Sequence, residues 1–147
     1  MQQVLNTEVM IMIVRTLDEI ANGPRDVRGN GWQSRRLLLR SDRMGFSLSD
    51  TVVAEGTEMR MEYKHHFEGN YCIAGEGEVV DLQSGTVYPL RPGTLYALDK
   101  HDAHIIRATR GDLRVVCVFS PPLVGDETHR ADSSYGPADD AATPRGA

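Results

Sequence analysis

The stretch that decides the fold begins Gly56-Thr-Glu-Met-Arg-Met-Glu-Tyr-Lys-His-His-Phe-Glu68-Gly-Asn-Tyr71-Cys-Ile-Ala-Gly75-Glu-Gly77 and resumes as Pro92-Gly-Thr-Leu-Tyr96-Ala-Leu-Asp-Lys-His-Asp-Ala-His104. Glycines and a Pro-Gly pair separate its short segments, and residues 58–63 alternate with the period of two that a strand requires. This order predicts a small antiparallel barrel that brings Glu68 and His104 to one mouth, where a divalent metal ion can bind.

Short strand-like segments separated by turn residues continue on both sides of this stretch, as in an antiparallel barrel or sandwich. Thr16-Leu-Asp-Glu19 has the form of a capping box and predicts a short helix. We expect a hairpin at Gly75-Glu-Gly77 and a turn at Arg110-Gly-Asp112. The strands are expected at 12–15, 35–39, 46–53, 58–63, 70–74, 77–82, 86–88, 95–98, 104–108 and 113–119.

The chain divides into one folded domain and two terminal segments. Residues 1–11 are expected to form a disordered N-terminal extension, and residues 12–129 the barrel domain. The end of the chain is rich in Asp, Ala, Ser, Pro and Gly and lacks apolar periodicity, so residues 130–147 are expected to be a flexible tail.

Composition excludes several classes of function. The 147 residues are 40% hydrophobic and carry a net charge of -5, which argues against a nucleic-acid binder because such proteins need a basic face. No apolar run approaches the ~18 residues of a membrane span, and no signal peptide is evident. We expect a cytoplasmic enzyme with a small-molecule substrate, in which Cys72 and Cys117 are buried free thiols.

The Gly-rich segment with Glu68 and the Pro-Gly segment before His104 resemble the metal-binding motifs of cupin barrels. Cupins usually have a His-x-His pair a few residues before the glutamate, but Arg60, Glu62 and Lys64 occupy that region here. A site of three histidines and one glutamate is therefore excluded. His65 and His66 are adjacent, so at most one of them points inward from a strand. A third ligand must come from elsewhere; Tyr96 is a candidate, and a plain barrel-wall aromatic is the alternative.

A more specific resemblance rests on several motifs in a fixed order. Between Met12 and His129 the chain resembles ectoine synthases, which are cupins of the bacterial compatible-solute pathway that serves under osmotic stress. The long motif ending Leu-Tyr-Ala-Leu-Asp-Lys-His-Asp-Ala-His104 is the most specific of them. The segments that carry the resemblance are 12–16, 32–39, 45–47, 50–51, 68–77, 88–89, 92–104 and 116–123.

The resemblance implies an all-β fold, a cupin-type antiparallel β-barrel (jelly-roll) with a short N-terminal helix and a flexible C-terminal tail. It also implies a hydro-lyase that closes N4-acetyl-L-2,4-diaminobutyrate into ectoine with loss of water, depends on Fe(II), forms homodimers and acts in the cytosol. The implied iron ligands are Glu68, Tyr96 and His104. The implied substrate and product contacts are Trp32, Arg36, Thr51, Tyr63, His66, Cys117 and Phe119, with Glu127 and His129 from the C-terminal segment.

The chemistry of this reaction suits such a site. An amine must attack an amide carbon, which is a poor electrophile, so a Lewis acid on the amide oxygen lowers the barrier. The amine must lose a proton and the oxygen must leave as water, and Tyr63 and His66 are the candidate proton carriers. Arg36 is expected to hold the substrate carboxylate.

Three other interpretations stay open on the sequence. One is a different metal-dependent cupin enzyme, such as a dioxygenase, a sugar isomerase or another lyase, although the first two normally keep the three-histidine set. Another is a non-catalytic cupin that binds a small ligand, which the missing His-x-His pair favours. The last is a barrel that serves dimerisation alone.

Overall fold

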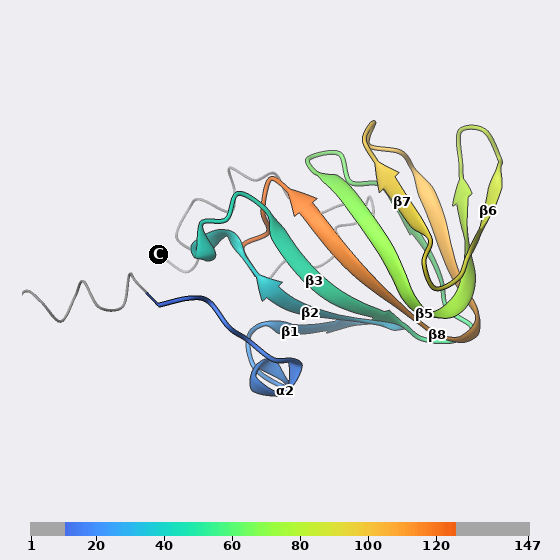
Figure 1. The fold of residues 1–147 in the computed structure, drawn as a ribbon. Coiled ribbons are helices and arrows are strands. Elements are labelled where there is room, and N and C mark those ends of the chain that lie inside the picture. Colours follow the sequence, from blue (N-terminus) through green and yellow to red (C-terminus); the bar gives the residue numbers. More distant parts are fainter. Residues whose placement is uncertain (1–10, 126–147) are drawn as a thin grey trace, which may run out of the picture.

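The computed structural model describes residues 11–125 of the chain, and Figure 1 shows their arrangement. Predictions that fall on residues 1–10 and 126–147, which include the flexible tail, Glu127 and His129, therefore lie outside the described residues. Within residues 11–125 the fold is all-β except for the helix α2, Leu17–Ile20, and the 3-10 turn η1, Arg40–Asp42. The eight strands of this part of the chain are β1 Asp26–Gly29, β2 Trp32–Leu38, β3 Ser47–Val53, β4 Glu58–Met61, β5 Phe67–Asp81, β6 Val87–Leu90, β7 Leu95–Leu98 and β8 His104–Ser120.

Two long strands, β5 and β8, hold the molecule together. They pair antiparallel from Phe67↔Ser120 to Asp81↔His104 and run side by side through the centre of Figure 1. The first half of β5 and the second half of β8 lie in the order β1-β2-β3-β8-β5-β7, whereas the other two halves pair with β6 and β4. Each long strand therefore belongs to both parts of a folded-over sheet, as in the predicted jelly-roll.

The predicted hairpin at Gly75-Glu-Gly77 is wrong, because β5 passes straight through it. Glycines are needed here for close approach to β8 instead of for a turn. A Cβ atom on Gly75 would lie 2.2 Å from the carbonyl oxygen of Asp112, and one on Gly77 would lie 2.0 Å from that of Arg107. Gly75 also has a φ of +78°, and the register shifts on both sides of Glu76 mark a β-bulge.

The predicted turn at Arg110-Gly-Asp112 is also wrong. β8 continues through it, and the pairs Glu76↔Arg110 and Ala74↔Arg114 leave three residues of β8 opposite one residue of β5. Gly111, with a φ of +72°, allows this bulge in an otherwise continuous strand. Turn and bulge use the same residue types, so the local sequence does not separate them.

The N-terminal part of the domain differs from the prediction in one place and agrees in another. Residues 12–15 form no strand; instead the Arg15 guanidinium donates to both carboxylate oxygens of Asp42, at 2.9 and 2.7 Å. The short helix is confirmed, since Thr16 Oγ1 accepts from Glu19 N and the Glu19 carboxylate accepts from Thr16 N.

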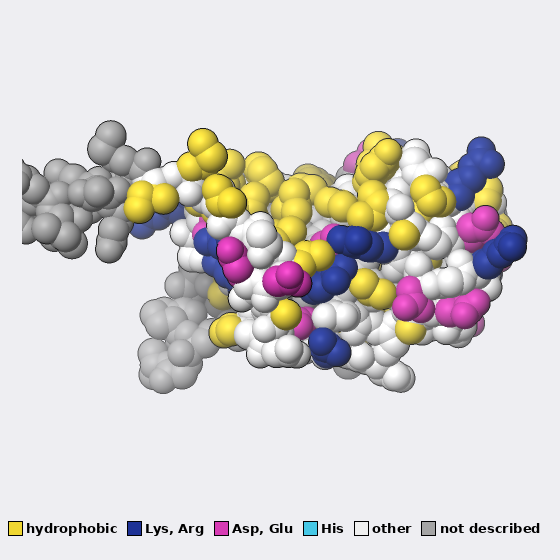
Figure 2. All heavy atoms as spheres, turned by 60° about the horizontal axis from the view of Figure 1, so that its bottom comes forward, with side chains coloured by type: hydrophobic (Ala, Val, Ile, Leu, Met, Phe, Trp, Pro, Cys, Tyr) yellow, Lys and Arg dark blue, Asp and Glu magenta, His cyan; other side chains and the backbone are white. Residues whose placement is uncertain are grey.

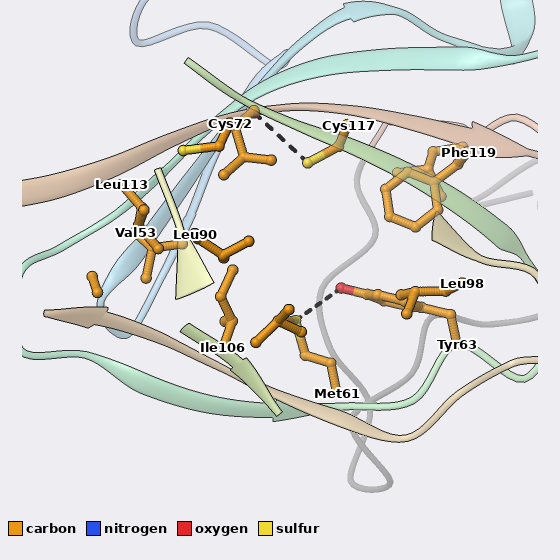
Figure 3. Packing of buried hydrophobic residues seen from close by; sticks show 14 of the residues in the cluster. Val53, Met61, Tyr63, Cys72, Leu90, Leu98, Ile106, Leu113, Cys117 and Phe119 are labelled. Atoms are coloured by element: carbon orange, nitrogen blue, oxygen red, sulfur yellow. Dashed lines mark hydrogen bonds between the residues drawn. The ribbon is translucent and has the colours of Figure 1, made fainter. Parts of the chain in front are cut away.

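The hydrophobic core fills the space inside the folded-over sheet (Figure 3). Leu113 and Cys72 of this core are fully buried, and both cysteines are buried free thiols, as predicted. No helix in the described part of the chain is long and apolar enough to cross a membrane. The core consists of Leu39, Val53, Met61, Tyr63, Cys72, Val79, Leu90, Leu98, Ile106, Ala108, Leu113, Val115, Cys117, Phe119 and Leu123.

Candidate active site

One cavity opens into the barrel beside this core and gathers most of the predicted site residues. The cavity is narrow, with a free volume of about 40 Å³ for the centres of water-sized molecules. Predicted site residues in its wall are Trp32, Thr51, Tyr63, Glu68, Tyr96, Cys117 and Phe119.

Glu68 contributes the one carboxyl group among the described residues that line this cavity. It is the second residue of β5, where the alternation of the strand turns it inward, and only 5% of it is exposed. Burial raises the pKa of its carboxyl from 4.5 to about 8, although the side chains of Asn70 and Cys117 act in the opposite direction. No lysine, arginine or histidine among residues 11–125 forms an ion pair with it, so the buried carboxylate lacks a cation.

Tyr96 stands between Glu68 and His104. Tyr96 lies on β7, where it pairs with Asn70 of β5. Its ring contacts the ring of His104 edge-on, with the ring centroids 6.3 Å apart. Burial, and next the charge of Glu68, raise the pKa of the Tyr96 phenol. His104 does not line the first cavity; together with Tyr96 it lines a second one between β6 and β7. Tyr96 is thus a wall of both cavities.

His104 is held with one ring nitrogen engaged and the other unpartnered. It is 1% exposed, and its Nδ1 lies 2.9 Å from the carbonyl oxygen of Asp102. Because a carbonyl oxygen only accepts, Nδ1 carries the hydrogen and Nε2 is a free acceptor. Nε2 is buried without a hydrogen-bond partner among the described residues. Burial also lowers the pKa of this imidazole, which favours the neutral form that binds metals.

These observations fit a metal ion. Within residues 11–125, no three His, Cys, Asp or Glu side chains form a metal-binding group, so the predicted set adds the Tyr96 phenol to Glu68 and His104. A buried carboxylate without a cation and a buried imidazole nitrogen without a donor are each groups that a divalent ion would satisfy. Oxygen and imidazole donors of this kind suit iron, zinc or manganese.

The opposite wall of the cavity holds three predicted substrate contacts. Trp32 begins β2, Thr51 lies in β3 and Cys117 lies in β8, and the three strands are neighbours in one sheet. The Cys117 thiol donates to Thr51 Oγ1 at 3.5 Å. Burial, and next the charge of Glu68, raise the pKa of this thiol, so it is neutral and hydrogen-bonding instead of a thiolate.

The ring of Phe119 contacts both candidate proton carriers. Tyr63 and His66 both contact its ring edge-on, at centroid distances of 5.2 and 5.8 Å. The Tyr63 hydroxyl donates to Met61 Sδ at 3.1 Å, a contact drawn in Figure 3. His66 is buried whereas His65 is exposed, as expected for adjacent residues, although both lie in a turn before β5 and not in a strand.

Arg36 does not line the cavity in this structure. It is fully buried in β2, where its Nε donates to Ser34 Oγ at 3.1 Å and its Nη1 to the carbonyl oxygen of Gly125 at 2.9 Å. Gly125 is the last described residue, so Arg36 fixes the start of the C-terminal segment. Glu127 and His129, which follow, lie outside the described residues.

The cavity wall also contains residues that the sequence analysis did not select. Asn70 is 1% exposed, and its side-chain nitrogen makes no hydrogen bond of ordinary geometry within the described part of the chain. It lies two residues after Glu68 on β5, a spacing that places it on the same face and could have found it. Ser34, Met59 and Met61 line the wall as well.

A folded-over antiparallel barrel with a buried carboxylate and imidazole inside it defines the chain as a cupin-type protein. A solved structure of the same fold, a Cupin 2 conserved barrel domain protein from Salinispora arenicola, matches with a TM-score of 0.60 at 23% identity, over 75% of this chain and 89% of that chain.

A sequence profile of the ectoine synthase family matches residues 12–139. The L-ectoine synthase of Desulfatibacillum aliphaticivorans is 53% identical over 88% of this chain and 100% of its own length. That of Desulfosudis oleivorans is 51% identical over 84% of this chain and 96% of its own. A crystal structure of ectoine synthase from P. lautus matches with a TM-score of 0.73 at 52% identity, over 76% of this chain and 80% of that chain. The chain belongs to the ectoine synthase family and is an enzyme.

Proposed function

We propose that the chain converts N4-acetyl-L-2,4-diaminobutyrate into ectoine in the cavity between β2, β3, β5, β7 and β8. The α-amine attacks the carbon of the acetamide, a ring C–N bond forms, and the acetamide oxygen leaves as water. Family membership supports this reaction over a binding protein, an isomerase or a dioxygenase. The single observation in the structure that carries it is the unpaired buried carboxylate of Glu68 facing the cavity.

Fe(II) is the proposed cofactor, with Glu68, Tyr96 and His104 as the residues that would hold it. When bound, it supplies a Lewis acid for the amide oxygen. The donor set of carboxylate, phenol and imidazole and the free Nε2 of His104 support this assignment.

The side chains of the cavity do the remaining work. The wall of Trp32, Thr51 and Cys117 presents an aromatic face and two hydrogen-bonding groups to the substrate. A cavity that holds the substrate in a folded conformation brings its amine next to its amide carbon. This proximity lowers the barrier, as it does in other intramolecular reactions. Tyr63, in the cavity wall, and His66, which contacts Phe119 of that wall without lining the cavity itself, are the proposed proton carriers. They would take the proton that leaves the amine and supply the proton that converts the departing oxygen to water.

The assay is anaerobic. Protein treated with a chelator is incubated with N4-acetyl-L-2,4-diaminobutyrate, with and without added Fe(II), and the product is followed by proton NMR. Ectoine in the iron sample alone supports both the reaction and the cofactor. Its absence from both samples, with folded and iron-loaded protein, would contradict the proposal.

A homodimer in the cytoplasm is the proposed state of the enzyme. Figure 2 shows hydrophobic side chains gathered in a band across one face of the molecule. Among the exposed apolar residues, Tyr71 of β5 and Leu95 of β7 are paired neighbours, and Phe67 lies on the same strand as Tyr71. A contiguous apolar surface of this kind is typical of an interface. Light scattering at several concentrations decides between a monomer and a dimer.

A further inference from the structure

His101 lies outside the residues assigned to the site, in the loop that joins β7 to β8. Its φ is +57°, a left-handed conformation that is uncommon for residues other than glycine. Asn and Asp tolerate that conformation better than most residues do. The loop ends at His104, three residues later. A residue kept in this conformation points to contacts that hold it there.

Those contacts are made with the loop that contains Tyr63 and His66, the candidate proton carriers. His101 Nδ1 lies 2.7 Å from the carbonyl oxygen of Tyr63 and 3.1 Å from that of His66. Both oxygens only accept, so Nδ1 carries the hydrogen and donates to them. The imidazole ring also stacks on Phe67, with centroids 5.1 Å apart and an angle of 22° between the planes.

Tyr63 and His66 lie between strands, where a tie of this kind helps to hold them. β4 ends at Met61 and β5 begins at Phe67, so no strand ladder fixes the five residues between them. A hydrogen bond to the main chain at Tyr63 and at His66 sets where both side chains leave the backbone. Those side chains in turn meet at Phe119 beside the cavity.

We propose that His101 is a positioning residue: its Nδ1–H holds the main chain at Tyr63 and His66 and thereby aims both side chains at the reacting groups. The inference rests on the proposed function, in which these two residues carry protons. Since His101 does not line the cavity proposed to hold the substrate, its loss should lower kcat much more than it raises KM. The substrate contacts at Trp32, Thr51 and Cys117 lie on other strands and stay in place.

Two variants test the hydrogen bond and the aromatic ring of His101 separately. In His101→Asn the amide nitrogen occupies the place of Nδ1, so the donor is kept, the ring is lost, and the left-handed conformation is well tolerated. In His101→Phe the ring is kept and the donor is lost. His65→Phe is the matched control, because His65 is an exposed histidine in the same turn as His66.

The expected result is a loss of about tenfold or more in kcat for His101→Phe, with KM changed by less than about threefold, since small displacements of reacting groups cost this much or more. His101→Asn should retain most of the activity, and His65→Phe should match the wild type. Equal losses in the Asn and Phe variants, or no loss in either, would overturn the proposal. Should the Phe variant not fold, His101→Gln replaces it, because its amide donor lies one bond further out.

A second readout does not depend on the reaction. Hydrogen exchange at the amides of residues 62–67, measured by mass spectrometry, should be faster in His101→Phe than in His101→Asn and the wild type. Equal exchange in all three would count against the tie. If the wild type makes no ectoine, the proposed function fails, whereas the exchange data still decide whether His101 holds this loop.

Discussion

Replacing Glu68 with glutamine tests whether the buried carboxylate is the electrostatic weak point of the metal-free protein. Burial raises the pKa of Glu68 from 4.5 to about 8, so between these values the folded state holds a proton that the unfolded state has lost. The unfolded state then binds fewer protons, and the stability of the folded state falls as the pH rises. The loss of folding stability caused by the ionisation of Glu68 is absent below about pH 4.5 and complete above about pH 8. Glutamine has the same shape and does not titrate.

The magnitude follows from the two pKa values. Each pH unit inside the window costs about 1.4 kcal/mol, and allowing for partial ionisation at both ends, the change from pH 5 to pH 7 is about 2 to 3 kcal/mol. Metal-free wild type and Glu68→Gln should therefore differ little in stability at pH 5. At pH 7 the wild type should have lost about 2 to 3 kcal/mol relative to the variant, because all other titrating groups are common to both proteins.

Urea denaturation of chelator-treated protein at pH 5, 6 and 7 measures this difference. Adding Fe(II) anaerobically at pH 7 should then stabilise the wild type and leave Glu68→Gln nearly unchanged, because metal binding requires the ionised carboxylate and stabilises only the folded state. If the free energy of unfolding changed with pH in the same way for both metal-free proteins, the reasoning would be refuted, because Glu68 would then have the same pKa in the folded and unfolded chains.

Tyr96→Phe keeps the ring that separates the two cavities and removes the phenol, so iron content and ectoine formation should both fall by about tenfold or more with the fold retained. Tyr71→Phe, at an exposed tyrosine on β5, is the control, and full iron loading in Tyr96→Phe would remove Tyr96 from the ligand set. Leu113→Ala empties a fully buried position in the core and should lower the free energy of unfolding by about 3 kcal/mol in urea, whereas Leu82→Ala, at an exposed position, should cost less than about 1 kcal/mol. Equal costs for the two leucines would contradict the assignment of the core.

Local chemistry accounts for the parts of the fold that could be predicted from the sequence. The helix after Thr16 forms through a capping box whose partners lie three residues apart, so a short segment contains the whole signal. The inward position of Glu68 follows from strand alternation and from the glycines around it. The same alternation explains why Cys72 and Cys117 are buried.

The predictions that are wrong concern segments whose structure depends on pairing with strands that are distant in the sequence. Gly75 and Gly111 both have positive φ, which suits a tight turn and a β-bulge equally well. Only the contact of β5 with β8 shows that the chain runs on. Asn70 was missed although its two-residue spacing from Glu68 places it on the same face of β5, and His101 was missed because it contacts residues 35 and 38 positions away.

The most direct test of the account supplies Fe(II) to the wild type and two variants in one anaerobic experiment. Wild type and Glu68→Ala are incubated with N4-acetyl-L-2,4-diaminobutyrate, and ectoine is measured by proton NMR, with circular dichroism to confirm the fold. Glu76→Ala, at an exposed glutamate of the same strand, is the control. The account predicts ectoine from the wild type and the control, and none from folded Glu68→Ala. Ectoine from Glu68→Ala at the wild-type rate would contradict the assignment of this cavity as the active site.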